Sequence, residues 1–369
     1  MKLLAICAAL IIATASNLEA APVHSTVAIA TRDEALTFAR SGTQTLAVTA
    51  YENGRIEGVD LTPVLKPGED AVDLVNRLGY DAAKDAIAKG TKVAMQAAAL
   101  DIPVRLTASH IAAGTNYREH AQEATVQGGP FLFPKLVEPT SSRAPIPAGN
   151  ALLDYEVELC LVAMKPLGPN DKASGGLILC NDVTDRATLL RNIDPSNPQS
   201  GKGFTSGKSA PGYLPVGDLF VVPRDLKAFV AGLDLQLSVN GQERQRARVT
   251  EWIWDLDEIL RQARAKRAVT WTYWGGTARF PFDSQGTIPA RTLVLAGTPA
   301  GTVFKGVNTG DYAFGILDWL IGGWDKTIAH HVVERHIAGA RAAKTYLQSG
   351  DTVTIQVGRL GRLENKVAP

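Results

Sequence analysis

The sequence predicts an α+β fold that is mainly β, with a small N-terminal α/β domain over residues 21–105 and a larger, mixed and mainly β domain over residues 106–369. Short apolar or alternating runs bounded by Gly, Pro, Asn and Asp recur along most of the chain, and such runs are typical of strands. Helical periodicity is limited to a few stretches. After Asp101-Ile102-Pro103, β-branched and aromatic runs return and Gly and Pro become frequent, which places the domain boundary near residues 100–105.

The N-terminal domain is expected to begin with strands and to continue with helices. Between residues 27 and 64, short apolar runs such as 27–30 and 46–49 alternate with turn signals such as Asn53-Gly54, which indicates a β-rich start. Residues 70–98 then carry apolar side chains at helical spacing, interrupted by two glycines, so two or three short helices are expected. The apolar positions and the interrupting glycines are Val72, Val75, Leu78, Gly79, Ala86, Ile87, Gly90, Val93 and Met95.

The larger domain is predicted to consist mostly of strands. Its clearest helix covers residues 252–264, because Trp252, Leu256, Ile259 and Leu260 fall on one helical face. Six short apolar or alternating runs are interpreted as strands. They cover residues 156–163, 176–181, 220–223, 233–239, 292–296 and 352–357.

Composition and charge restrict the class of protein. The 369 residues are 45% hydrophobic and 20% charged, close to the average of globular proteins, which argues against disorder and long coiled coil. Lys and Arg number 38 against 37 Asp and Glu, and the formal net charge is +1 without any basic block. We therefore expect no binding to nucleic acid, since such binding requires positive charge to neutralise phosphates.

The N-terminus has the order of parts typical of a secretory signal peptide. Lys2 is the positive residue, residues 3–13 form an apolar run, and small residues follow with candidate cleavage sites after Ala15 and Ala20. The run is shorter than the ~20 residues needed to cross a bilayer. We expect residues 1–20 to be removed, and the mature protein to be exported, periplasmic or secreted, without a membrane anchor.

Three carboxylates stand in or beside two apolar runs that resemble buried strands. Glu156 and Glu158 are two residues apart, so on a strand both point to the same face, and Asp182 follows the run at residues 176–180. Carboxylates without Cys or His beside them suit a hard cation, Mg²⁺ or Mn²⁺ before Zn²⁺, with Ca²⁺ as a further candidate. The alternative is a solvated strand face followed by a turn, and spacing alone gives this alternative slightly more weight.

A second candidate site lies in residues 114–123. If this segment begins a helix, His120 and Glu123 are i, i+3 neighbours, and the carboxylate can orient the imidazole as a general base. The alternative is a surface helix turn with an incidental histidine.

Two further patterns have weaker chemical meaning. Residues 295–302 follow an expected strand, and their amides and the Thr298 hydroxyl are suited to hold a substrate carboxylate, although a plain turn explains them equally well. The group His330, His331, Glu334 and His336 is interpreted as the solvated face of a helix, because it does not follow a His-Glu-x-x-His pattern.

Five segments in a fixed order identify a family. They are residues 116–123 (NYREHAQE), 155–159 with 181–184 (YEVEL and NDVT), 207–217 (GKSAPGYLPVG), 239–243 (VNGQE) and 296–301 (AGTPAG). Together they resemble the fumarylacetoacetate hydrolase family, over residues 112–303 and again over 350–365. The resemblance implies a mixed β-sandwich or roll for the larger domain, interrupted by an insertion over residues 305–349 that covers the site or forms an interface.

The resemblance also implies roles for individual residues. These roles are metal binding by Glu156, Glu158 and Asp182, a catalytic dyad of His120 and Glu123, and substrate binding by Thr298, Lys135, Tyr117 and Gly297. The catalytic lysine of the family falls on Lys208, with Lys202 as the rival position.

The activity implied by the resemblance is metal-dependent hydrolysis of a C–C bond in an acylpyruvate or related 2,4-dioxo acid. His120 would activate water, and Lys208 would offset negative charge on oxygen. The same site also suits a hydratase, decarboxylase or keto-enol isomerase of a 2-oxo acid. An exported, non-catalytic binding protein is a third reading, but the intact dyad argues against it, because a binder has no need of a general base. The habit of the family suggests a homodimer.

Cys160 and Cys180 are the two cysteines of the expected mature chain. By strand alternation, Cys160 shares a face with Glu158 and Cys180 shares one with Asp182. In an antiparallel hairpin closed around Asn170, Cys160 would face Cys180 and Glu158 would face Asp182, within reach of a disulfide. Two reduced, buried cysteines are the alternative, and it has slightly more weight.

Overall fold

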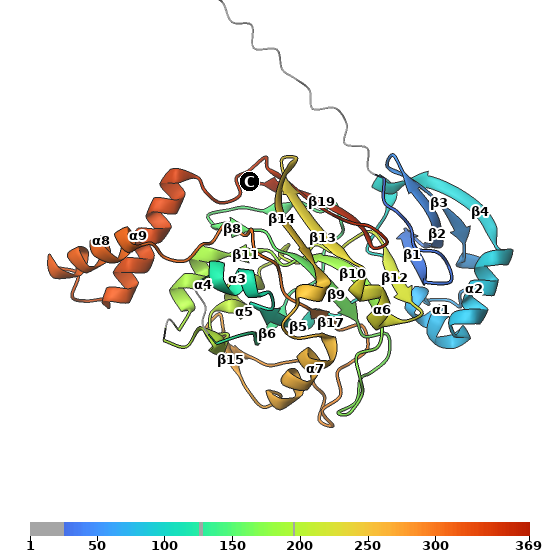
Figure 1. The fold of residues 1–369 in the computed structure, drawn as a ribbon, viewed down its shortest axis with the longest axis horizontal. Helices are drawn as coiled ribbons and strands as arrows, with labels where there is room; N and C mark the ends of the chain where they lie inside the picture. The colour runs from blue at the N-terminus through green and yellow to red at the C-terminus, as the bar shows by residue number, and fades with distance from the viewer. Residues whose placement is uncertain (1–25, 125–127, 195) are drawn as a thin grey trace, which may run out of the picture.

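The computed structural model describes residues 26–124, 128–194 and 196–369. The expected signal peptide at residues 1–20 lies outside the described residues. Figure 1 shows a central body of sheets, with the N-terminal strands at one end and a helical hairpin projecting from the other. Within the described residues, no helix is both long and apolar enough to span a membrane.

A ten-stranded sheet runs through most of the molecule. Its strand order is β4-β3-β2-β1-β12-β10-β9-β17-β5-β6, and β17 and β5 pair in parallel while the other pairs are antiparallel. The strands are β1 Ala35–Ser41, β2 Gln44–Glu52, β3 Arg55–Asp60, β4 Thr91–Gln96, β5 Ser109–Gly114, β6 Phe131–Leu136, β9 Val157–Val162, β10 Gly176–Asn181, β12 Phe220–Pro223 and β17 Leu293–Leu295. The N-terminal strands therefore continue the sheet of the larger domain through the β1–β12 pair.

The N-terminal segment contains two helices, α1 Ala71–Leu78 and α2 Tyr80–Lys89, separated at Gly79 as the sequence predicts. Two local predictions are wrong. Residues 27–30 form no strand. Val93 and Met95 lie on β4 instead of a helix, because pairing with β3 outweighs the helical spacing of the apolar residues.

A second, five-stranded sheet covers β9 and β10. Its order is β14-β13-β18-β19-β7, with β7 Ile146–Pro147, β13 Asp234–Val239, β14 Gln242–Arg248, β18 Thr352–Val357 and β19 Gly361–Ala368. Two small pairs complete the strands, β8 Leu153–Asp154 with β11 Thr184–Asp185 and β15 Trp271–Tyr273 with β16 Gly276–Ala278. Buried side chains of both large sheets form one core, so the prediction of a mixed, mainly β fold is confirmed.

The remaining helices surround the sheets. They are α3 Arg118–Glu123, α4 Arg186–Asn192, α5 Phe204–Lys208, α6 Leu226–Ala231, α7 Leu256–Ala265, α8 Thr309–Leu320 and α9 Ile328–Ala343. Short 3-10 turns occur at Thr62–Val64, Ala97–Ala99, Pro198–Ser200 and Val249–Glu251. The predicted helix at 252–264 begins only at Leu256, because the Asp255 side chain caps the helix by accepting from the Glu258 amide. The insertion forms α8 and α9, which pack against each other and project from the body (Figure 1).

The β9–β10 hairpin contains a disulfide between Cys160 and Cys180, with their Cα atoms 6.1 Å apart. The predicted side-by-side arrangement of the two cysteines is therefore confirmed. The more heavily weighted alternative of two reduced cysteines is wrong, and the predicted register is wrong by two residues. Cys160 faces Ile178, and Cys180 faces Glu158. A shift of two keeps every side chain on its face, so strand alternation cannot distinguish the two registers. The disulfide joins diagonal neighbours on the face that also carries Glu158.

Candidate active site

Three buried carboxylates meet at one end of the β9–β10 hairpin. Glu158 lies on β9, Glu156 immediately precedes this strand, and Asp182 directly follows β10. The Asp182 amide donates to the Glu156 carbonyl (2.9 Å), which brings the two strand ends together. One oxygen from each carboxylate lies within 4.8 Å of the other two, and all three residues are buried. Burial excludes the alternative of a solvated strand face.

Two buried lysines contact these carboxylates. Nζ of Lys208 lies 2.7 Å from Oε2 of Glu156 and 2.8 Å from Oδ2 of Asp182. Nζ of Lys135 lies 2.6 Å from Oδ1 of Asp182. Burial by itself would raise the pKa of Asp182, but the two ammonium groups outweigh burial and hold this pKa below its ordinary value. The rival Lys202 is exposed, so the structure places Lys208 at the carboxylates.

Arg186 is a residue of the site that the sequence analysis missed. It begins α4, and its guanidinium donates to Oδ2 of Asp154 (2.8 Å) and to Oε1 of Glu156 (2.7 Å). Asp154 is also buried and accepts the amide of Val303 (2.9 Å). The spacing of the acids could have indicated such a residue. Asp154, Glu156 and Glu158 alternate along one run, and a third buried carboxylate requires a further cation beside it.

Glu158 differs from its neighbours, because within the described part of the chain it takes part in no ion pair with Lys, Arg or His. Its Oε2 accepts the Gly297 amide (2.7 Å). Burial and the charges of Asp182 and Glu156 raise the pKa of Glu158 well above its ordinary value.

The charges around the carboxylates do not balance. Four buried acids (Asp154, Glu156, Glu158 and Asp182) face three buried cations (Lys135, Arg186 and Lys208). The excess negative charge would attract a divalent cation to the oxygens of Glu156, Glu158 and Asp182, and such an ion would change the net charge of the group from −1 to +1. The donors are all carboxylate oxygens, which is the ligand type that hard cations prefer, so the residues fit such an ion.

His120 and Glu123 lie on α3, with Nδ1 of the imidazole 3.5 Å from Oε2 of the carboxylate. The carboxylate is fixed from the other side, because it accepts the Gly301 amide (3.0 Å) and pairs with Lys305. Burial alone would raise the pKa of Glu123, but the bonds from His120, Lys305 and Gly301 hold this pKa at about 2. Glu123 is therefore ionised and faces Nδ1, which leaves Nε2 of His120 for a molecule in the cavity.

Thr298 lies in the loop after β17, where its hydroxyl accepts from Nε2 of Gln245 (2.9 Å). Gln245, on β14, also accepts the Val157 amide (2.9 Å) and donates to the Pro299 carbonyl (2.8 Å). It is 1% exposed and joins the Thr298 loop to β9. Gln245 is a second residue that the sequence analysis missed, since it lies just beyond the matched segment at 239–243.

The loop after β17 requires a glycine at position 297. Its φ is +92°, and a Cβ atom at this position would lie 2.7 Å from Cβ of Asn116. Asn116 in turn donates to the carbonyls of Ala296 (2.8 Å) and Trp254 (2.9 Å), which fastens the start of α3 to the loop. The close approach lets the Gly297 amide reach Glu158.

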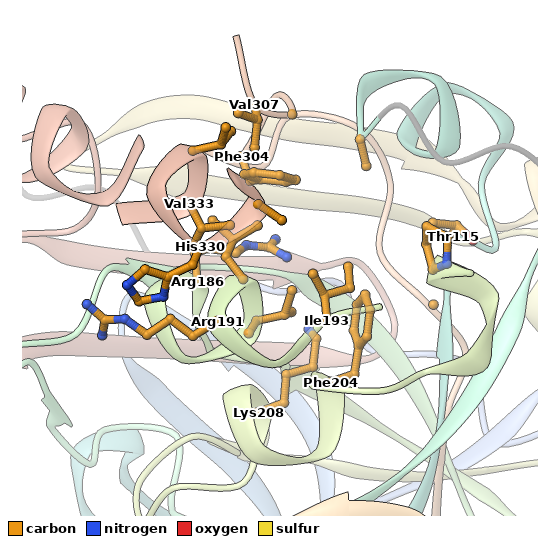
Figure 2. Close-up of a pocket in the computed structure, with 18 of the residues that line it drawn as sticks. Thr115, Arg186, Arg191, Ile193, Phe204, Lys208, Phe304, Val307, His330 and Val333 are labelled. Carbon is orange, nitrogen blue, oxygen red and sulfur yellow. The ribbon is translucent and has the colours of Figure 1, made fainter. Parts of the chain in front are cut away.

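A cavity of about 1140 Å³ opens beside these groups. The polar residues His120, Glu156, Arg186, Lys208 and Thr298 contribute to its lining. Figure 2 shows Ile193, Phe204 and Lys208 on one side, and Phe304, Val307 and Val333 on the other. The predicted site residues Lys135, Tyr117 and Gly297 are buried but do not contribute to this lining. A contact of these three residues with substrate stays a prediction.

One histidine of the insertion, His336, is less solvated than the sequence predicts. Nδ1 of His336 lies 2.8 Å from Oδ2 of Asp311 on α8. Glu334 forms an ion pair with Arg191 on α4 (2.6 Å), and His330 lines the cavity. The prediction of a solvated helix face is correct for His330, which is exposed, and wrong for His336, because α9 folds back against α8.

The sequence pattern of the fumarylacetoacetate (FAA) hydrolase C-terminal domain matches residues 109–368. The chain belongs to this family. The family prediction is thereby confirmed.

Several proteins of known name are similar to this fumarylacetoacetate hydrolase family member. The mitochondrial oxaloacetate tautomerase fahd-1 of Caenorhabditis elegans is 29% identical over 226 residues, which are 57% of this chain and 90% of the relative. The 2,4-didehydro-3-deoxy-L-rhamnonate hydrolase of a Sphingomonas species is 26% identical over 43% of this chain and 56% of its own length. These relatives are enzymes that act in different ways on small acids.

A solved structure supports the fold. Maleylpyruvate hydrolase from Sphingobium sp. SYK-6, in complex with manganese(II) and pyruvate, superposes with a TM-score of 0.56 at 18% sequence identity. The match covers 90% of this chain and 99% of the hydrolase. The two proteins therefore share a fold over nearly their whole lengths.

Proposed function

We propose that this protein is a divalent-metal-dependent hydrolase that cleaves a C–C bond in an acylpyruvate or related 2,4-dioxo acid. The observation that carries the proposal is that one cavity is lined by His120, by Lys208 and by Glu156 of the carboxylate group. Glu123, fixed by the Gly301 amide and by Lys305, orients the imidazole. A protein that only binds its ligand has no need of a base held in this way.

Glu156, Glu158 and Asp182 would hold the metal ion. Mg²⁺ is our first candidate and Mn²⁺ the second. The manganese complex of the maleylpyruvate hydrolase supports a divalent ion at this place. A divalent ion bound there supplies a Lewis acid for a 2-oxo carboxylate and stabilises negative charge on its keto oxygen.

The side chains of the chain supply the remaining chemistry. Nε2 of His120 removes a proton from water, and the water oxygen forms a bond to the acyl carbonyl carbon. The bond between this carbon and C3 of the pyruvyl part then breaks. Its electron pair gives the pyruvate enolate, which takes a proton at C3, and the second product is a carboxylic acid. Lys208 and Arg186 hold Glu156 in place, and Lys208 offsets negative charge that develops on the substrate.

Keto-enol tautomerisation of a 2-oxo acid is a second candidate. It is favoured by the similarity to the oxaloacetate tautomerase, which extends over 90% of that relative. The same imidazole would then move a proton between carbon and oxygen, and water would not be consumed.

A substrate panel tests both candidates. Purified mature protein with Mg²⁺ or Mn²⁺ is incubated with acylpyruvates and with the enol form of oxaloacetate. Pyruvate release and the loss of enol absorbance are both followed. Pyruvate release with an equal amount of carboxylic acid supports the hydrolase, and accelerated enol decay without cleavage supports the tautomerase. If neither occurs while the compounds bind, the protein is a binding protein.

Export and a homodimer also remain proposals. The signal-like N-terminus and the Cys160–Cys180 disulfide support export, because disulfides persist in oxidising compartments. N-terminal sequencing of protein from the periplasm and the medium tests export, and a chain that starts at Met1 in the cytoplasm would contradict it. Sedimentation equilibrium of the mature protein tests the dimer.

A further inference from the structure

We propose that the acyl group of the substrate is long and apolar, and that the α8–α9 hairpin forms the wall that selects it. This inference rests on the proposed function, since it names the class of acyl group that the hydrolase accepts. It comes from the composition of the cavity beyond the carboxylates.

The cavity is much larger than the reacting part of an acylpyruvate requires. Its volume of about 1140 Å³ lies slightly above the range of about 300–1,000 Å³ found for pockets that hold drug-sized ligands. A pyruvyl group has only three carbon atoms. Most of the space therefore lies beyond the groups that would contact the 2-oxo acid.

The space beyond the polar groups has two apolar walls. The core supplies one wall, with Phe133, Leu189, Ile193 and Phe204 among its residues. The insertion supplies the other, with Val307, Trp324, Ile328 and Val333, and Phe304 directly before the insertion adds to it. Figure 2 shows side chains from the two walls facing each other across the cavity. Such walls favour hydrocarbon, because burying it removes apolar surface from water on both sides.

The charges on this part of the lining do not favour a substrate whose acyl group carries a second carboxylate. The Arg191 guanidinium is already held by both oxygens of Glu334, at 2.6 and 2.8 Å. Lys326 lines the mouth beside Asp325, and both residues are exposed. The other basic side chains of this part of the lining, Lys326 and His330, are both exposed. A carboxylate buried deeper against the apolar wall would therefore lose its water without meeting a buried, unpaired cation, which is costly.

Several apolar side chains at the cavity are uncovered. Trp324 is 71% exposed and Ile328 is 40% exposed, although both line the cavity. A bound hydrocarbon chain would cover this surface. Leu320 on α8 is also exposed (56%) but does not contribute to the lining, so it provides a matched control.

The insertion is fastened to the body and can act as a fixed wall. Ile337 of α9 is buried in a cluster with Leu152 and Ala187. Arg341 donates to the carbonyl of Asn150 (2.9 Å). These contacts join α9 to the segment before β8 and to α4, which begins with Arg186.

A binding series tests the inference without requiring turnover. Calorimetry in Mg²⁺ or Mn²⁺ measures the Kd of pyruvate, 2-oxobutanoate, 2-oxohexanoate and 2-oxooctanoate. We expect the affinity to rise by roughly fourfold for each methylene, which corresponds to burial of that group. Affinity that does not change with chain length would overturn the inference, as would tighter binding of 2-oxoadipate than of 2-oxohexanoate.

Point variants locate the effect. Trp324→Ala is expected to weaken 2-oxooctanoate binding by about fivefold or more, because part of the apolar wall is removed, while pyruvate binding stays the same. Leu320→Ala should change neither. An equal effect of both variants would show that the insertion does not form the selective wall.

The outcomes for the two proposals can be separated by adding acetylpyruvate and octanoylpyruvate as substrates. Chain-length-dependent binding without cleavage of either compound would retain the apolar site and overturn the hydrolase. Cleavage of acetylpyruvate with chain-length-independent binding would retain the hydrolase and overturn the apolar site.

Discussion

Nζ of Lys208 donates to Oδ2 of Asp182 over 2.8 Å, and both side chains are almost completely buried. The ammonium group is therefore fixed against the carboxylates that are expected to hold the metal ion. Burial opposes its charge, but the attraction of Asp182 and Glu156 outweighs burial and raises the pKa of Lys208 above its ordinary value. The lysine is thus a permanent positive charge at the site and not a proton acceptor near neutral pH.

Replacing this charge should reduce turnover. Lys208→Met is expected to lower kcat by roughly 10²–10³-fold, the range found when one stabilising group of an active site is removed. Lys202→Met is the matched control, because Lys202 is exposed and should give wild-type turnover. Steady-state kinetics on the best acylpyruvate of the panel checks the prediction, and a larger loss at Lys202 would contradict it.

Replacing Glu158 should weaken metal binding strongly and affect the stability of the fold little. Glu158→Gln is expected to weaken Mn²⁺ binding by at least about 100-fold, because one of three charged oxygen ligands is lost. The amide oxygen can still accept from the Gly297 amide, so the fold should persist. Calorimetric titration with Mn²⁺ and circular dichroism measure the two properties. An unchanged Mn²⁺ affinity would remove Glu158 from the ligand set.

Removing the imidazole of the dyad should reduce turnover without weakening metal binding. His120→Ala is expected to lower kcat by roughly 10²–10⁴-fold with little change in Mn²⁺ affinity, because the imidazole acts as a base and is not a ligand. Glu119→Gln, an exposed position on the same helix, is the control and should retain wild-type turnover. Wild-type turnover of His120→Ala would exclude the proposed base.

The disulfide should contribute to stability without being needed for the site. It closes a loop with a sequence separation of 20 residues, for which the chain-entropy estimate is about 3 kcal/mol. The Cys160→Ala, Cys180→Ala double variant should lose about this free energy of unfolding in urea titrations. Mn²⁺ binding should persist, since Lys135, Lys208 and the backbone pairing hold the carboxylates. If stability does not change, the disulfide does not restrict the unfolded chain.

A buried acid between the N-terminal strands and the larger sheet should make stability depend on pH. Asp218 accepts from the Tyr51 hydroxyl (2.8 Å) and the Arg362 amide (3.1 Å). Burial outweighs these hydrogen bonds and raises the pKa of Asp218 to about 6. The folded state thus binds this proton more tightly than the unfolded state, whose pKa is ~3.9. The resulting stabilisation is complete below pH ~3.9 and is lost as the pH rises through about 6.

Comparison with Asp218→Asn isolates this effect from other titrations. The variant stays neutral, so its stability relative to wild type should increase by up to about 3 kcal/mol between pH 4 and pH 8. Thermal unfolding curves at several pH values measure the difference. A constant difference over this range would show that Asp218 does not take up a proton on folding.

The sequence by itself determined six strands of the larger domain and, through the resemblance to the family, the residues that meet at the site. A strand has a side-chain period of two, so Glu156 and Glu158 had to share a face, and helical spacing placed His120 beside Glu123. The ordered segments around these residues identified the family. The six strand predictions in the larger domain succeeded because their apolar runs pack into one core.

Only the tertiary structure decided the hairpin register, the partners of the buried acids and the place of the insertion. The register shift of two residues preserves every face, so no sequence pattern could reveal it. Arg186 pairs with Asp154, which lies 32 residues away in the sequence. Arg191 pairs with Glu334 of α9, which lies 143 residues away. Such pairs form because burial of a charge requires an opposite charge nearby in space, and a local sequence pattern does not specify which distant residue supplies it.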